Sequence, residues 1–156
     1  MDDVDLDIIK QKRKLEITKI KNCNEYTKKY GITLTDDQIK NIIERKVETL
    51  KETGRIEFRE SVIDKIIKEF CDSPYIFQQN YAETLYELID IFYEYKNETM
   101  DLISDNELIE FMKKNFDGIC QGDLDYLSGT VMNKMREDLT RPISLNNKES
   151  DDKDYE

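Results

Sequence analysis

Apolar residues return every three or four positions in six stretches of the chain, which is the spacing of a helix with one buried face. The clearest stripe comprises Ile39, Ile42, Ile43, Val47 and Leu50. The same spacing predicts further helices over residues 15–30, 62–70, 81–100, 104–112 and 123–139. In the first of these helices, Ile20, Cys23, Tyr26 and Tyr30 fall on one side and are predicted to face the core.

Short polar signals mark where these helices begin and end. Three pairs have the spacing of an N-terminal cap: Thr35 with Gln38, Asn80 with Glu83, and Ser104 with Glu107. Gly31 and Gly54 each follow a helix and are able to take the left-handed conformation that ends it. Pro74 stops the helix over 62–70, because the residue before a proline is pushed out of the helical region.

These elements predict an all-α fold, a compact single-domain bundle of five to six helices with short connections. The length of 156 residues suits one domain, and five Gly and two Pro leave little material for the turns of a β-sandwich or barrel. We predict a frayed or disordered N-terminus over 1–14 and a helical domain over 15–140. The segment 141–156 has no apolar period and is predicted to be a disordered acidic tail.

Composition excludes several kinds of chemistry. The chain has no His, which removes serine triads, Cys–His dyads and histidine-based zinc or di-iron sites. It also lacks the glycine-rich loops that cradle phosphates. Asp117 begins a stretch with Gly122 at the sixth position of an EF-hand loop, but Ser128 stands where the bidentate glutamate is required. We therefore predict no catalytic residue, no metal and no cofactor.

The cysteines and the apolar runs indicate the compartment. Cys23, Cys71 and Cys120 are odd in number and far apart, which favours buried thiols in a reducing compartment. No apolar run exceeds three residues and the chain starts with acidic residues, so no membrane span or signal peptide is predicted. The predicted location is cytoplasmic.

The most distinctive feature is a row of acids on the helix over 81–100. Glu83, Glu87, Asp90, Glu94 and Glu98 fall within a wedge of about 80° at 100° per residue. Two interpretations stay open: a solvated face, or a docking strip for a basic partner or a bound cation. The row belongs to a chain with 24 Lys plus Arg, 35 Asp plus Glu and a net charge of −11.

The opposite charge lies near the N-terminus, in the segment Lys10–Lys29, where lysine and arginine outnumber the acids. Lys10, Lys14, Lys21 and Lys28 share one face of a helix. Direct nucleic-acid binding is disfavoured, because the acidic remainder of the chain would repel phosphates. The alternative is that this segment lies against the acidic row, within the chain or across a homodimer.

One predicted loop carries three apolar residues in succession, Tyr75, Ile76 and Phe77. The loop is either a lid over the core or an aromatic anchor presented to a partner, since aromatic residues are enriched at binding hot spots.

Several strings resemble a small helical protein family of clostridial-type Firmicutes with no assigned activity. They are Cys23-Asn24-Glu25, Lys29-Tyr30-Gly31, the run from Lys51 to Phe58, the run from Phe70 to Tyr75, Phe116-Asp117-Gly118 and the run from Tyr126 to Gly129. The resemblance covers residues 20–132 and implies a source but no chemistry.

Together these observations predict a cytosolic protein–protein interaction or adaptor module that uses its acidic helix face to bind a protein with a basic surface. The alternative is an acidic nucleic-acid mimic that blocks a basic groove on a DNA-handling protein. A small enzyme with a carboxylate base is less favoured.

Overall fold

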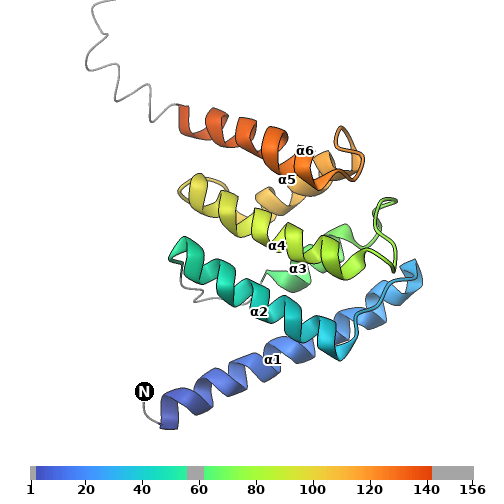
Figure 1. The fold of residues 1–156 in the computed structure, drawn as a ribbon, viewed down its shortest axis with the longest axis vertical. Helices are drawn as coiled ribbons and strands as arrows, with labels where there is room; N and C mark the ends of the chain where they lie inside the picture. Colours follow the sequence, from blue (N-terminus) through green and yellow to red (C-terminus); the bar gives the residue numbers. More distant parts are fainter. Residues whose placement is uncertain (1–2, 56–61, 142–156) are drawn as a thin grey trace, which may run out of the picture.

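The computed structural model describes residues 3–55 and 62–141 of the chain, and within these ranges it contains helices and no strand. In chain order the elements are α1 (Asp3–Thr27), the short 3₁₀ turn η1 (Lys28–Tyr30), α2 (Asp36–Thr53), α3 (Ile63–Phe70), α4 (Tyr81–Glu98), α5 (Asp105–Asp117) and α6 (Leu124–Tyr126). The last helix continues through the π-helical segment η2 (Leu127–Met132) and over residues 133–141. The predicted all-α bundle is confirmed (Figure 1).

Helix α4 is the centre of the bundle. It packs against α2, α3, α5 and α6, and its buried residues come from nearly every side of the helix. Leu85, Leu88, Ile89 and Phe92 are almost completely buried, and each such side chain contributes roughly 1.5–3 kcal/mol of hydrophobic stabilisation. Because so much of α4 is covered, only a narrow outward face is left for charged residues.

The helix boundaries follow the predicted signals with one exception. Thr35 forms a complete capping box with Gln38, and Gly54 ends α2 in the left-handed conformation with a φ of 67°. Ser104 accepts a hydrogen bond from the backbone N–H of Glu107. Asn80 precedes the first residue of α4 as predicted, but its side chain does not cap the helix. It bonds the preceding loop instead, at the Phe77 N–H and the Tyr75 carbonyl.

Helix α1 differs most from its predicted form. It begins at Asp3, so it includes most of the segment 1–14 that was predicted to be frayed. Tyr26 and Tyr30 were predicted to face the core, but each is 42% exposed, and Thr27 is buried beside them instead. The ammonium group of Lys29 lies 4.1 Å from the ring centroid of Tyr26, which gives this aromatic pair a cation–π contact at the surface. The tail predicted over 141–156 lies, after Arg141, outside the described residues.

Two further predictions can be compared with the described part of the chain. Cys23, Cys71 and Cys120 are buried free thiols, as predicted. Their burial raises the pKa of each thiol, which disfavours the reactive thiolate. Among the described helices, none is long and apolar enough to cross a membrane.

Candidate functional site

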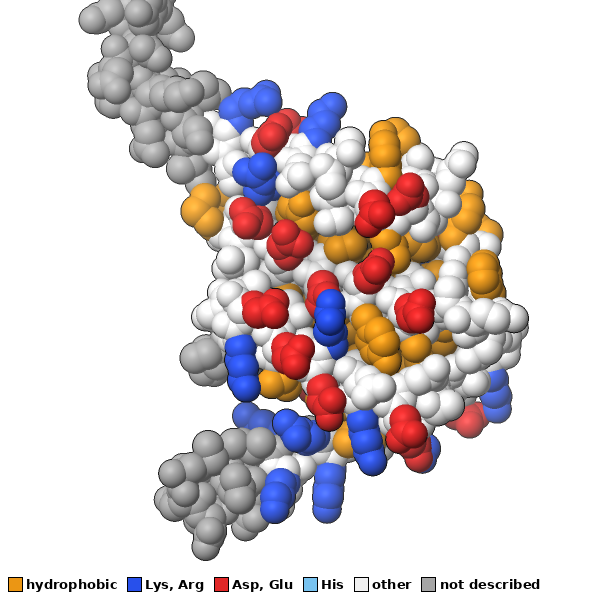
Figure 2. Space-filling view, viewed as in Figure 1, with side chains coloured by type: hydrophobic (Ala, Val, Ile, Leu, Met, Phe, Trp, Pro, Cys, Tyr) orange, Lys and Arg blue, Asp and Glu red, His pale blue; other side chains and the backbone are white. Residues whose placement is uncertain are grey.

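The acidic strip of α4, defined as Glu83, Glu87, Asp90, Glu94 and Glu98, lies along the one outward face of this central helix. Glu83, Glu87, Glu94 and Glu98 are exposed, whereas Asp90 is half-buried. Figure 2 shows acidic side chains spread over the middle of this view of the molecule, with basic side chains along its lower and upper edges and one among the acids.

Asp90 differs from the rest of the strip because it has partners inside the fold. Its carboxylate accepts hydrogen bonds from Arg45 Nε at 2.9 Å and Nη2 at 2.5 Å, and from the Thr49 hydroxyl at 2.7 Å. Both partners belong to α2, so Asp90 fixes α4 against α2. The neighbouring carboxylate in turn raises the pKa of the Arg45 guanidinium. Asp90 is thus a structural member of the strip.

The four glutamates of the strip have no ion-pair partner among the residues that the structure describes. The electrostatic consequence is clearest at Glu94, whose pKa is raised by partial burial and then by the negative charges of Glu98 and Asp90. A raised carboxyl pKa means that the ionised form is disfavoured in the folded protein. Glu94 therefore carries its charge at a cost. A nearby cation would offset the part of this cost that comes from Glu98 and Asp90.

The basic segment does not reach the acidic strip within one chain. Helix α2 lies between α1 and α4 in Figure 1, and it contacts both helices. The contact with α1 includes an ion pair at 2.6 Å between Lys46 of α2 and Glu16 of α1. The member of this pair that comes from α1 is therefore an acid and not a lysine of the basic segment. Lys21 pairs with Asp36 at 3.3 Å on the surface. The interpretation that Lys10–Lys29 packs on the strip of its own chain is not supported by these contacts.

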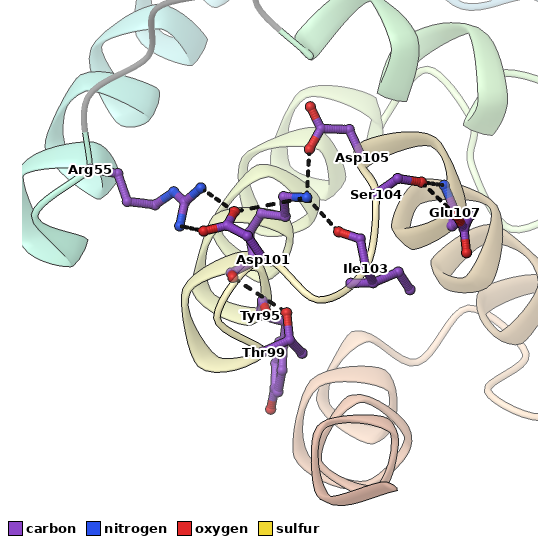
Figure 3. A network of polar contacts seen from close by, with 9 residues as sticks. Arg55, Tyr95, Thr99, Asp101, Ile103, Ser104, Asp105 and Glu107 are labelled. Atoms are coloured by element: carbon purple, nitrogen blue, oxygen red, sulfur yellow. Dashed lines mark hydrogen bonds and ion pairs between the residues drawn. The ribbon is translucent and has the colours of Figure 1, made fainter. Parts of the chain in front are cut away.

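A second polar cluster follows the end of α4, where Lys96 and Arg55 form ion pairs with Asp101 and Asp105 (Figure 3). Lys96 Nζ donates to the carbonyl oxygen of Ile103 at 2.5 Å and lies 3.0 Å from the carboxylate of Asp105 and 3.9 Å from that of Asp101. Arg55 donates to both carboxylate oxygens of Asp101, at 2.6 and 3.2 Å. This Lys96 clamp joins the end of α2 and the start of α5 to α4.

The clamp also explains an unusual turn. Met100 and Asp101 both have positive φ angles, 54° and 59°, in the left-handed region that non-glycine residues rarely adopt. The ion pairs hold Asp101 in this conformation, and Arg55 lowers the pKa of its carboxyl group through hydrogen bonding. Sequence reasoning missed the clamp, although one signal was present: Lys96 follows Leu88 and Phe92 at four-residue spacing on the buried side of α4. A lysine in an apolar stripe indicates an internal ion pair.

The aromatic loop divides between the two predicted roles. Ile76 is buried in the core, and Tyr75 is half-buried with its ring 6.3 Å from that of Phe116 in an edge-on arrangement. Phe77 is 53% exposed. Tyr75 also lies so close to Gly122 that a Cβ atom there would stand 2.6 Å from the Tyr75 Cβ. Two of the three side chains therefore cover the core, and only Phe77 is free to contact a partner.

The loop after Asp117 is a helix–loop–helix corner. The Asp117 carboxylate accepts hydrogen bonds from the Ser73 hydroxyl at 2.5 Å and pairs with Lys113 at 2.8 Å. Lys113 also pairs with Asp72 at 2.7 Å. No group of three or more potential metal-ligating acids or cysteines occurs in the part of the chain that the structure describes.

The fold and the strip define a class of protein: a compact all-α domain with an acidic surface along its central helix. By its sequence, the chain belongs to a family of unknown function, DUF6323, whose model matches residues 19–144. The match includes the whole acidic strip and the Lys96 clamp, and it begins within α1. Neither a curated protein nor a solved structure matches the chain.

Proposed function

We propose that this protein is a non-catalytic interaction module that binds a protein partner through the acidic strip of α4. The observation that carries the proposal is the lack of ion-pair partners, among the described residues, for Glu83, Glu87, Glu94 and Glu98. They occupy the only outward face of a helix that is otherwise buried. The partner presents a basic surface to this face.

The energetics support this assignment. Like charges three or four residues apart on a helix each cost about 0.2–0.5 kcal/mol, and the strip contains a succession of them. The raised pKa of Glu94 indicates that this repulsion acts in the folded protein. A basic partner lowers the repulsion when it binds, so part of its binding free energy comes from this relief. Added salt weakens such binding, because it screens exposed charges.

The test compares the original protein with a variant that removes the charges of the strip but retains the pairing of Asp90. That variant carries Glu83→Gln, Glu87→Gln, Glu94→Gln and Glu98→Gln. A matched control loses the same number of exposed acids from other helices through Glu25→Gln, Glu44→Gln, Glu69→Gln and Glu110→Gln. Immobilised proteins are used for capture from a cell extract at low salt and at about 0.5 M salt.

We expect proteins that the original chain and the control capture at low salt to be lost with the strip variant. Their capture by the original chain also falls at high salt. Equal capture by the strip variant would show that the strip is only a solvated face. Thermal unfolding of all three proteins checks that they are folded.

An acidic nucleic-acid mimic is the second candidate. The spread of acidic side chains beyond α4 on the face seen in Figure 2 favours it, since a mimic needs carboxylates on more than one element. Arg45 argues against it, because this cation binds Asp90 in the middle of the row. Competition with duplex DNA for the captured protein separates the two candidates: a mimic is displaced by DNA, and an adaptor is not.

The cellular location and the source of the protein are also proposals. Three buried free thiols support a cytoplasmic protein, and the sequence resemblance implies a clostridial source. The acidic net charge of −11 supports a protein partner over direct binding to nucleic acid or to an anionic membrane surface.

A further inference from the structure

A stretch near the start of α1 is uncovered among the side chains that the structure describes. Every side chain from Lys10 to Leu15 is exposed, and Ile8 and Leu15 are 47% and 66% exposed. Contacts with the bundle begin at Glu16 and Ile17, which are half-buried, and Ile20 is 1% exposed. A short helix without tertiary contacts is marginally stable in water. The exposed stretch over residues 10–15, which we call the basic arm, therefore has the form of an element that lacks a packing partner among the described residues.

The charges of the arm are opposite in sign to those of the acidic strip. Its exposed bases are Lys10, Lys12, Arg13 and Lys14. At 100° and 1.5 Å per residue, Lys10 and Lys14 lie about 40° apart around the helix and about 6 Å apart along it. By the same geometry Glu83 and Glu98 are about 22 Å apart along α4. Among the described residues, neither the Lys10 nor the Lys14 ammonium group has an ion-pair partner. Two helical stripes of opposite charge thus occur in the same chain.

The fold prevents these two stripes from meeting within one molecule. Helix α2 separates α1 from α4, and it is fixed on both sides by ion pairs: Lys46 with Glu16 toward α1, and Arg45 with Asp90 toward α4. The complementary surfaces are therefore available to each other only between two copies. A two-fold arrangement lets each copy give its arm and receive the other arm, so the contact is made twice.

We infer that the basic arm of one copy docks on the acidic strip of a second copy, which makes the protein a reciprocal homodimer. This inference rests on the proposed function and names its partner as a second copy of the chain. Because the contact is formed mainly by exposed charges, the dimer is weak and salt-dependent.

Charge reversal in two full-length variants tests the inference. The arm variant carries Lys10→Glu, Lys12→Glu and Lys14→Glu. The strip variant carries Glu87→Lys, Glu94→Lys and Glu98→Lys. Sedimentation velocity measures the mass of each protein, and of their equimolar mixture, at about 0.05 M and 0.5 M salt. An additional arm variant with the same three lysines changed to Gln removes the charge without adding acids.

We expect the original protein to be dimeric at low salt and monomeric at high salt. Each reversed variant alone is monomeric at low salt. The mixture forms a heterodimer, in which one contact has its original charges and the other has both signs exchanged. The Lys-to-Gln arm variant is also monomeric. Circular dichroism and thermal unfolding confirm that each variant retains the bundle.

A monomeric original protein at low salt would overturn the inference, as would a mixture that stays monomeric. Binding of the wild-type arm to anionic vesicles or to duplex DNA, with no self-association, would likewise assign a different occupant to the arm. A peptide with the sequence of residues 8–21 then tests the strip separately. If calorimetry shows that it binds the original protein and not the glutamine strip variant, the strip still docks a basic ligand and the proposed function survives. If the peptide does not bind, the inference of a homodimer fails, and the capture experiment with the glutamine strip variant alone decides the proposed function.

Discussion

Two carboxylates near the end of α4 show how differently this protein treats its acidic residues. Glu94 belongs to the acidic strip, and burial and its acidic neighbours raise its pKa. Asp101 belongs to the Lys96 clamp, and Arg55 lowers its pKa. The folded protein therefore disfavours the charge of the first carboxylate and favours that of the second.

The difference separates charges that hold the fold together from charges that are left for another molecule. In the Lys96 clamp, each acid has a cation from a different helix or turn, so the ion pairs fix the arrangement of the bundle. In the strip, Asp90 alone has such a partner among the residues that the structure describes. We therefore expect substitutions in the clamp to change stability, and substitutions of the four glutamates to change association.

The largest expected effect is that of Lys96→Met. The variant leaves Asp101 and Asp105 without their shared cation and the Ile103 carbonyl without its donor. Removing one member of a buried ion pair costs about 3–5 kcal/mol, and the exposure of the two acids reduces this to roughly 2–3 kcal/mol here. Thermal unfolding should show a lower melting temperature. Lys114→Met, at an exposed position of α5, is the control and should melt close to the original protein. Equal melting temperatures of the two variants would contradict a structural role for the clamp.

Asp90→Asn should have the next largest effect and tests whether the strip is uniform. The variant weakens two charge-assisted hydrogen bonds from Arg45 and one from Thr49 across the α2–α4 contact. Because Arg45 is half exposed, we expect a loss of about 1 kcal/mol, measured by urea unfolding. The neighbouring Glu87→Gln is the matched control and should not destabilise the protein. If Asp90→Asn is as stable as Glu87→Gln, Asp90 belongs with the unpaired glutamates.

Glu94→Gln should stabilise the protein slightly, by a few tenths of a kcal/mol at neutral pH, because it removes a disfavoured charge. A carboxyl group with a raised pKa keeps its proton to higher pH in the folded state than in the unfolded state. Its ionised form therefore lowers stability at neutral pH, and this penalty disappears as the pH falls below about 4. The gain from Glu94→Gln should disappear over the same range in unfolding measurements.

Asp101→Asn should change stability with the opposite sign to Glu94→Gln. With a lowered pKa in the folded state, the Asp101 carboxylate contributes stability above its ordinary pKa, and this contribution is lost as the pH falls through the folded value. Asp101→Asn should therefore be less stable than the original protein at neutral pH and equal to it in acid. Asn is suited to the left-handed backbone at this position, so the change acts mainly on charge. The same sign of pH dependence for both variants would remove the distinction between the two regions.

The smallest expected effect is that of truncation after Asn146. It removes five acids and two bases from the end of the chain. The removed residues contain little apolar surface to bury, so the truncated protein should melt within a degree or two of the original. This result is also expected if the stability of the protein depends on where an acid lies more than on the total charge. A large fall in melting temperature would show that the tail contributes to the fold.

The sequence by itself determined where most helices lie and how several of them end. The apolar stripe of α2 and its cap at Thr35 depend on residues within a few turns of one another, and so does the glycine at position 54. Local spacing is sufficient for such features. The same spacing placed the five acids of the strip on one face of α4, although it gave no indication that one of them would differ from the rest.

Only the tertiary structure decided which charges are paired. Arg45 and Asp90 are far apart in the sequence, as are Arg55 and Asp101, and their contacts depend on how α2 packs beside α4. Helical periodicity also predicted Tyr26 as a core residue, but the packing of α1 buries Thr27 and leaves Tyr26 at the surface. Periodicity defines which residues share a face of a helix. Which neighbour covers that face, and with which charge, depends on contacts between distant segments, and these follow from the packing of the whole bundle.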